Sequence, residues 1–168
     1  GTGGIGHDVA ELLTTSKTEP MTNAEFFDAW GVDPTSRTRG GQKEPAKQHA
    51  AREVTLMQRG TVKVGARLGK STGWIHRIKL NRRGVKVMTG CVYHKIDDQG
   101  LHYSMNGEQR VLAVDNVVMC AGQDPEQGLL SPLEKAGVSV SLIGGARFAS
   151  ELDAKRAIDE GTRLAYGF

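Results

Sequence analysis

The sequence is poor in aromatic residues, in long apolar segments and in net charge. Aromatic residues make up 5% of the 168 residues, and the formal net charge is +3. No apolar run approaches the roughly 18 residues that a membrane-spanning helix needs, and the N-terminus lacks the basic and apolar regions of an export signal. With 38% hydrophobic and 24% charged residues, the composition predicts a soluble, folded, cytoplasmic protein. A net charge this small requires neither a nucleic-acid nor a membrane partner.

Cysteines and catalytic motifs are equally scarce. Cys91 and Cys120 lie far apart in strand-like apolar runs, without Cys or His at metal-ligand spacing, which predicts reduced core thiols. His76, His94 and His102 fall on separate predicted elements, and no nucleophile elbow or suggestive carboxylate pair is present. We therefore expect no metal site and no catalytic side chain in this sequence, and the chemistry would depend on a cofactor.

Glycine is the abundant residue, with 22 occurrences, and the most informative group stands at the start of the sequence. Gly1, Gly3 and Gly6 form a G-x-G-x-x-G motif that leads directly into a helical pattern. In a dinucleotide fold the first glycine makes a tight turn, the second admits the pyrophosphate, and the third lets helix and strand pack closely. The phosphates then lie at the helix N-terminus, where unpaired N–H groups attract anions. The motif favours a dinucleotide site; a glycine-rich terminus without function is the alternative.

The end of the next predicted strand, residues 53–58, indicates which dinucleotide is bound. In dinucleotide-binding folds, this position holds an acidic residue that binds the ribose hydroxyl of NAD, or a basic residue that binds the 2′-phosphate of NADP. Here Gln58 and Arg59 are followed by Lys63, and no carboxylate stands between Glu53 and Asp97. The pattern favours NADPH; ordinary solvated cations at Arg59 and Lys63 are the alternative.

Gly69-Lys70-Ser71 resembles the end of a P-loop but does not complete the motif. A P-loop requires a glycine five residues before Gly69, and Val64 stands there. Ser71 or Thr72 as the N-cap of a helix explains these residues better.

The first third of the sequence predicts two helices and a loop. The first helix begins within the glycine motif. A capping box at Thr22 and Glu25 predicts a second helix that ends at Gly31. This helix is expected to bury its three aromatic side chains, which are Phe26, Phe27 and Trp30. Residues 34–51 are rich in basic residues, glycine and proline, and predict a long surface loop.

The rest of the sequence continues to alternate helices and strands. Residues 91–114 have an apolar period of two with turns at 97–100 and 106–107, which predicts a three-stranded antiparallel meander. The last helix is expected from near Ser150, with Asp153 as a capping partner. Further helices are expected over 72–83 and 129–136, and further strands over 85–88, 117–120 and 138–143. The order predicts an α/β, three-layer, Rossmann-like fold with an inserted meander, in which the strand expected before Gly1 is missing.

Five segments together resemble the C-terminal portion of bacterial NADPH-dependent 2,4-dienoyl-CoA reductases. They are GTGGIGHDVAELL, GKSTGWIHR, YHKIDDQGLHYSMNGE, AVDNVVMCAGQDP and LIGGARFASELDAKRAIDEGTRLA. The resemblance covers essentially the whole chain, and GKSTGWIHR and CAGQDP are its most specific blocks. It implies a flavoprotein oxidoreductase of fatty acid β-oxidation in which electrons pass from NADPH through FAD, an iron-sulfur cluster and FMN to the dienoyl-CoA.

The resemblance also implies a domain division and a set of site residues. Residues 1–114 match the NADPH domain, and residues 115–168 match the closing segment of the FAD domain. Arg147 stands where the family resemblance leads us to expect an acidic residue. The pyrophosphate loop matches Gly1, Gly3, Gly4 and Gly6, and the 2′-phosphate position matches Arg59 and Lys63. The FAD positions match Ala121, Gly122, Gln123, Gly144, Gly145, Glu151 and Leu152.

From this resemblance we expect a fragment that is inactive alone, with the FMN, the iron-sulfur cluster and the catalytic acid in the absent N-terminal part. Its partners would be NADPH, FAD and the remainder of the reductase. A partner chain filling the incomplete sheet, and hence self-association, is a further expectation, because unpaired inner strand edges are costly. A basic module that binds anions or nucleic acid, without enzymatic activity, is the alternative suggested by the cations over 37–52.

Overall fold

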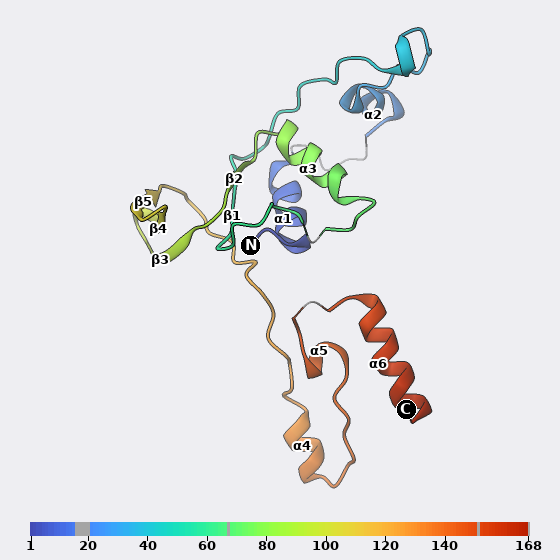
Figure 1. The fold of residues 1–168 in the computed structure, drawn as a ribbon, viewed down its shortest axis with the longest axis vertical. Helices are drawn as coiled ribbons and strands as arrows, with labels where there is room; N and C mark the ends of the chain where they lie inside the picture. The colour runs from blue at the N-terminus through green and yellow to red at the C-terminus, as the bar shows by residue number, and fades with distance from the viewer. Residues whose placement is uncertain (16–20, 67, 151, 168) are drawn as a thin grey trace. The chain divides into compact units, whose positions relative to one another are not determined.

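The computed structural model describes residues 1–15, 21–66, 68–150 and 152–167 (Figure 1). The chain divides into two compact units, Gly1–Cys120 and Ala121–Phe168, which are called here the N-terminal and the C-terminal unit. The N-terminal unit contains α1 (Gly4–Thr14), α2 (Asn23–Trp30), η1 (Arg39–Gly41), β1 (Thr55–Met57), α3 (Gly73–Arg82), β2 (Lys86–Met88), β3 (Val92–Asp97), β4 (Gly100–Met105) and β5 (Glu108–Leu112). The C-terminal unit contains α4 (Leu130–Lys135), α5 (Gly144–Arg147) and α6 (Ala154–Tyr166).

Two small sheets form the N-terminal unit. Strands β1 and β2 pair in parallel, with Leu56 opposite Val87. Strands β3, β4 and β5 form the predicted antiparallel meander in that order. The turn between β4 and β5 has positive φ at both Asn106 and Gly107, as a two-residue hairpin of this sequence requires.

The core lies on both sides of β1, because neighbouring residues of a strand point to opposite faces. Leu56 packs with Ala10 of α1 and Leu80 of α3. Met57 packs on the other side in a cluster with Cys91, Leu101 and Tyr103. Strand β1 therefore lies between a helical layer and the meander, which confirms the predicted three-layer, Rossmann-like α/β fold.

Several helix ends follow their local sequence signals. Thr22 and Glu25 form both bonds of the capping box, and Gly31 ends α2 in the left-handed region. Residues 34–51 contain no helix or strand longer than the single turn η1, in agreement with the predicted loop.

Asp153 caps α6 by accepting from the Arg156 N–H, so the helix begins at Ala154 rather than near Ser150. Helix α3 begins at Gly73, and its N-cap Thr72 makes no side-chain capping bond, which corrects the predicted hydroxyl cap.

Two predicted strands are wrong. Residues 117–120 and 138–143 have no strand structure, and in the described part of the chain neither segment pairs with a sheet. Val118 and Met119 are 52% and 71% exposed. A continuous apolar run favours a buried strand, but a strand forms only where a neighbouring strand accepts its hydrogen bonds. The composition of a segment does not show whether a neighbouring strand is available to pair with it.

Burial also differs from expectation at two places. Phe26 is 48% exposed and contacts Phe27 and Trp30 along the surface of α2, so Ala29 is the buried residue of this helix. Cys91 is a fully buried free thiol, and burial raises its pKa. Cys120 is also free but only half-buried, so the prediction of two core thiols holds for Cys91 alone.

Within the described residues, no helix combines the length and apolar character needed to cross a bilayer. The same residues contain no group of three or more His, Cys, Asp or Glu side chains arranged to hold a metal ion.

Candidate functional site

The glycine motif forms the N-terminus of α1. Gly3 is the N-cap in extended conformation, and the first bonded helical N–H is that of His7, which donates to the Gly3 carbonyl oxygen at 3.1 Å. The N–H groups of the preceding first turn have no intrahelical acceptor, and no acidic residue stands in that turn. The helix therefore presents N–H groups without an intrahelical acceptor and the positive end of its dipole, a combination that binds anions.

The three motif glycines have different surroundings. A Cβ built on Gly6 would overlap the carbonyl oxygen of Gly1 and lie 2.9 Å from the carbonyl carbon. A Cβ on Gly3, or on the adjacent Gly4, would meet no atom within 4 Å. Gly6 is thus required by close packing of the chain on itself, whereas Gly3 and Gly4 border open space that a ligand could approach.

The glycine motif at Gly1–Gly6, called here the glycine loop, is hydrogen-bonded to the loop that follows β1. The buried hydroxyl of Thr2 donates to the side-chain carbonyl oxygen of Gln58. The Gln58 amide donates in turn to the Gly60 carbonyl oxygen at 3.0 Å and to that of Val62. The backbone N–H of Gln58 donates to the carbonyl oxygen of Met88 in β2, also at 3.0 Å. The bonds of Thr2 and Gln58 therefore hold the glycine loop next to the loop that contains Arg59 and Lys63. The sequence motifs assign both loops to one dinucleotide.

Arg59 and Lys63 both lie exposed in the loop organised by Gln58. In the part of the chain that the structure describes, neither forms an ion pair with a carboxylate. Arg59 lies near Tyr93, whose pKa is raised by burial and, to a smaller extent, by Cys91, while the charge of Arg59 lowers it. The glycine loop and these two cations therefore occupy adjacent loops of the N-terminal unit.

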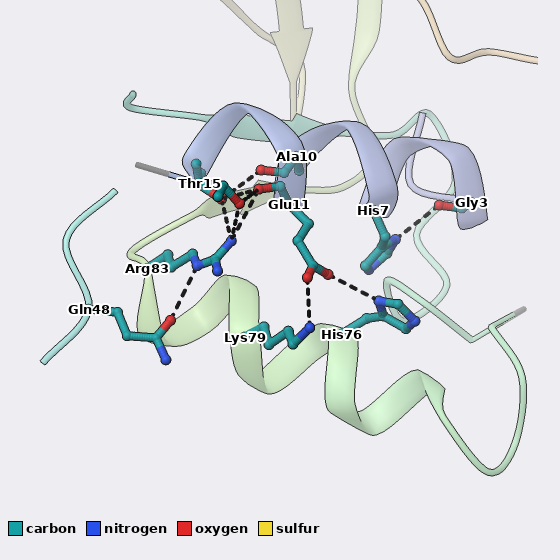
Figure 2. Close-up of polar contacts among 10 residues, drawn as sticks. Gly3, His7, Ala10, Glu11, Thr15, Gln48, His76, Lys79 and Arg83 are labelled. Atoms are coloured by element: carbon teal, nitrogen blue, oxygen red, sulfur yellow. Dashed lines mark hydrogen bonds and ion pairs between the residues drawn. The ribbon is translucent and has the colours of Figure 1, made fainter. Parts of the chain in front are cut away.

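Helix α1 is held against α3 by a charged contact (Figure 2). The Glu11 carboxylate lies 2.7 Å from Lys79 Nζ and 3.5 Å from His76 Nδ1. Burial raises the pKa of Glu11, but the hydrogen bond and charge of Lys79, with contributions from His76 and Arg83, outweigh it and hold the pKa below its ordinary value. Glu11 lies in the C-terminal half of α1, so the contact holds that half of the helix against α3.

Arg83 holds the C-terminal end of α1. Its guanidinium donates to the Glu11 carbonyl oxygen at 3.1 Å and to the hydroxyls of Thr14 and Thr15, and it also contacts Gln48 (Figure 2). A cation here also suits the negative end of the helix dipole. Sequence reasoning missed these contacts of Arg83 and the Thr2–Gln58 bond, because partners separated by 35 to 72 residues leave no local signal.

Replacement of Glu11 by glutamine is expected to lower the free energy of unfolding by about 1 kcal/mol at neutral pH, because a partly buried ion pair is lost. The folded-state pKa lies below the unfolded value of 4.5, so the stabilisation is present above that value and disappears as the pH falls through the folded-state pKa. Urea unfolding of Glu11→Gln and of the parent should therefore converge in acid. Exposed Glu44→Gln is the matched control; a Glu11 effect of equal size at all pH values would contradict the assignment.

The seven residues predicted to bind FAD all belong to the C-terminal unit. A hollow of about 520 Å³ is lined by Gln123, Gly145 and Leu152, together with Asp124, Glu126, Ala146 and Ala149. The structure therefore brings together three of the seven residues. Ala121, Gly122 and Gly144 do not line this hollow, and Glu151 lies outside the described residues.

Arg147 has a structural partner in this unit. Its guanidinium lies 2.7 Å from the Glu160 carboxylate, which also accepts from the Gly144 N–H at 2.6 Å. These bonds, first that of Arg147 and then that of Gly144, hold the pKa of Glu160 below its ordinary value. Arg147 thus joins α5 to α6.

Three comparisons place these features among known proteins. A family model described as pyridine nucleotide-disulphide oxidoreductase matches residues 1–153. Mercuric reductase from Staphylococcus aureus is 30% identical over 96 residues, which cover 55% of this chain and 17% of that protein. The solved complex of 2-naphthoyl-CoA reductase with 2-naphthoyl-CoA aligns with a TM-score of 0.57 at 24% identity, over 67% of this chain and 17% of that one. The structural likeness supports the fold, and the chain spans a small part of the length of either protein.

Proposed function

The chain belongs to the pyridine nucleotide-disulphide oxidoreductase family, and we propose that it is the NADPH-binding part, with the closing segment of the FAD-binding part, of an NADPH-dependent 2,4-dienoyl-CoA reductase. Membership of this family implies an oxidoreductase that binds FAD and NAD(P). The choice of NADPH and of a dienoyl-CoA substrate goes further and rests on the residues and segments described above.

The observation that carries the proposal is the tethering of the glycine loop to the loop after β1. Through Thr2 and Gln58, the donors at the N-terminus of α1 and the cations Arg59 and Lys63 lie in adjacent loops of one unit. A dinucleotide phosphate needs both: backbone donors for the pyrophosphate and a cation for a 2′-phosphate. The surroundings of Gly3 and Gly6 fit such a ligand. Gly3 borders open space that the pyrophosphate could occupy, whereas Gly6 is packed against the backbone of Gly1.

Each group of residues has a distinct part in this proposal. The N–H groups at the start of α1 would bind the pyrophosphate, and Arg59 with Lys63 would select NADPH over NADH. The hollow at Gln123, Gly145 and Leu152 would contact FAD, with Ala121, Gly122, Gly144 and Glu151 completing that site. When bound, NADPH supplies a hydride and FAD accepts it; the side chains of this chain bind and orient the cofactors and supply no acid, base or nucleophile.

Calorimetric titration of the purified chain with NADPH, NADH and duplex DNA across a salt series tests the proposal. We expect NADPH to bind more tightly than NADH, and no dienoyl-CoA reduction by the chain alone. Equal affinity for the two cofactors would remove the NADPH assignment. A steep decrease of DNA affinity with salt, without cofactor binding, would favour the anion-binding alternative.

A further inference from the structure

A basic loop, residues 33–52, has no part in the proposed cofactor site. It contains five Lys or Arg residues and two acidic residues, so its formal charge of +3 equals that of the whole chain. The remainder of the chain is therefore neutral on balance, and the net positive charge is concentrated in one segment. Every residue from 34 to 40 is exposed, which makes this part of the loop a protruding tip.

The tip is organised around one carboxylate. Asp33 Oδ1 accepts from the N–H and hydroxyl of Thr35, at 2.9 and 2.6 Å. Asp33 Oδ2 accepts from the N–H of Arg37 and the N–H of Thr38, both at 2.9 Å, and from the Thr38 hydroxyl at 3.0 Å. These bonds fix the backbone on either side of Ser36, whose φ is +54°. The Arg37 and Arg39 side chains take no part in this network.

The base of the loop is fastened to α2, and α2 to α3. Val32 pairs with Gln42 in an antiparallel bridge, and the Lys43 ammonium lies 2.5 Å from the Asp28 carboxylate. Arg82 of α3 donates to the Ala29 carbonyl oxygen at 2.8 Å and stacks over the Trp30 ring. Figure 1 shows α2 and η1 together, away from the meander. The tip is thus a preorganised projection of the N-terminal unit.

We propose that this projection is a docking surface for an acidic protein surface, with Arg37 and Arg39 as the contacting side chains. Both are exposed, and within the described residues neither forms an ion pair, whereas Lys43 already has Asp28. Guanidinium groups bind carboxylates through two parallel hydrogen bonds, and a prearranged loop loses little entropy on binding.

The form of the loop favours this partner over two others. A protruding, exposed tip does not enclose a small anion, as ligand sites normally do. Residues 33–52 contain no Phe, Tyr or Trp, the large aromatic side chains on which the bases of a single strand stack most strongly. An acidic protein surface requires neither an enclosure nor a stacking platform.

Fluorescence anisotropy with a labelled Glu/Asp-rich peptide tests the proposal, with a Gln/Asn peptide of equal length and a duplex DNA as comparison probes. We expect the acidic peptide to bind and the neutral peptide not to. The Arg37→Gln/Arg39→Gln variant should weaken acidic-peptide binding roughly fivefold. The exposed pair Lys135→Gln/Lys155→Gln removes the same charge elsewhere and should change it less than about twofold.

A further variant separates loop structure from charge. Asp33→Asn makes the loop more positive but removes the carboxylate that organises it, so we expect weaker peptide binding despite the added charge. Stronger binding by this variant, equal losses in both double variants, or tighter binding of DNA than of the acidic peptide would each overturn the proposal. NADPH affinity should stay unchanged in the Arg37→Gln/Arg39→Gln variant, so failure here is distinguishable from failure of the proposed function.

Discussion

Replacement of Gly6 by alanine is expected to remove dinucleotide binding and to destabilise the N-terminal unit by about 1–3 kcal/mol, the usual cost of forcing an extra carbon into a closed space. The new Cβ would overlap the backbone carbonyl of Gly1 and meet the Cys120 side chain at 4.0 Å. Backbone cannot move aside as a flexible side chain can, so the loop must shift away from the start of α1. Thermal unfolding and calorimetry with NADPH measure the two effects.

Gly3→Ala is the matched control for this variant. Gly3 has an extended backbone that alanine adopts readily, and a Cβ there meets nothing within 4 Å. We expect Gly3→Ala to unfold at the parent's temperature but to bind NADPH more weakly, because the methyl group occupies the proposed path of the pyrophosphate. Parent-like NADPH affinity in Gly6→Ala, or in Gly3→Ala, would contradict the placement of the phosphates at this loop.

Replacement of Arg59 by alanine is expected to weaken NADPH binding by about 10- to 100-fold, since a hydrogen bond to a charged group contributes about 1.5–3 kcal/mol. NADH lacks the 2′-phosphate, so its affinity should change less than about twofold. Arg59 is exposed, and its side chain has no carboxylate partner among the described residues, which leaves the guanidinium available to a ligand. Calorimetric titration with each cofactor gives the ratio directly.

Lys70→Ala serves as the control for Arg59, because Lys70 is an exposed cation of the same unit outside the proposed site. It should leave the ratio of NADPH to NADH affinity unchanged. An equal loss of both cofactors in Arg59→Ala would show that Arg59 supports the loop instead of recognising the 2′-phosphate. An equal loss of NADPH binding in Lys70→Ala would show that general charge, and not a particular residue, sets the preference.

The sequence alone predicted the features that depend on residues close together in the chain. The capping box at Thr22 and Glu25, the end of α2 at Gly31 and the turn at Asn106 and Gly107 all occur as expected. Each of them needs only a hydrogen bond within one helical turn or a backbone angle that glycine or asparagine tolerates. The motif at Gly1–Gly6 belongs with them, because the start of α1 follows from local sequence.

Only the tertiary structure decided which apolar segments pair and which polar groups meet. The run over 117–120 has the composition of a buried strand, yet it is not one, because a strand requires a partner that composition cannot provide. Thr2 reaches Gln58, and Glu11 reaches Lys79, across 56 and 68 residues. Such contacts depend on how distant elements pack. The Thr2–Gln58 bond holds the glycine loop next to the loop that contains Arg59, so the arrangement of the candidate site is a property of the folded chain.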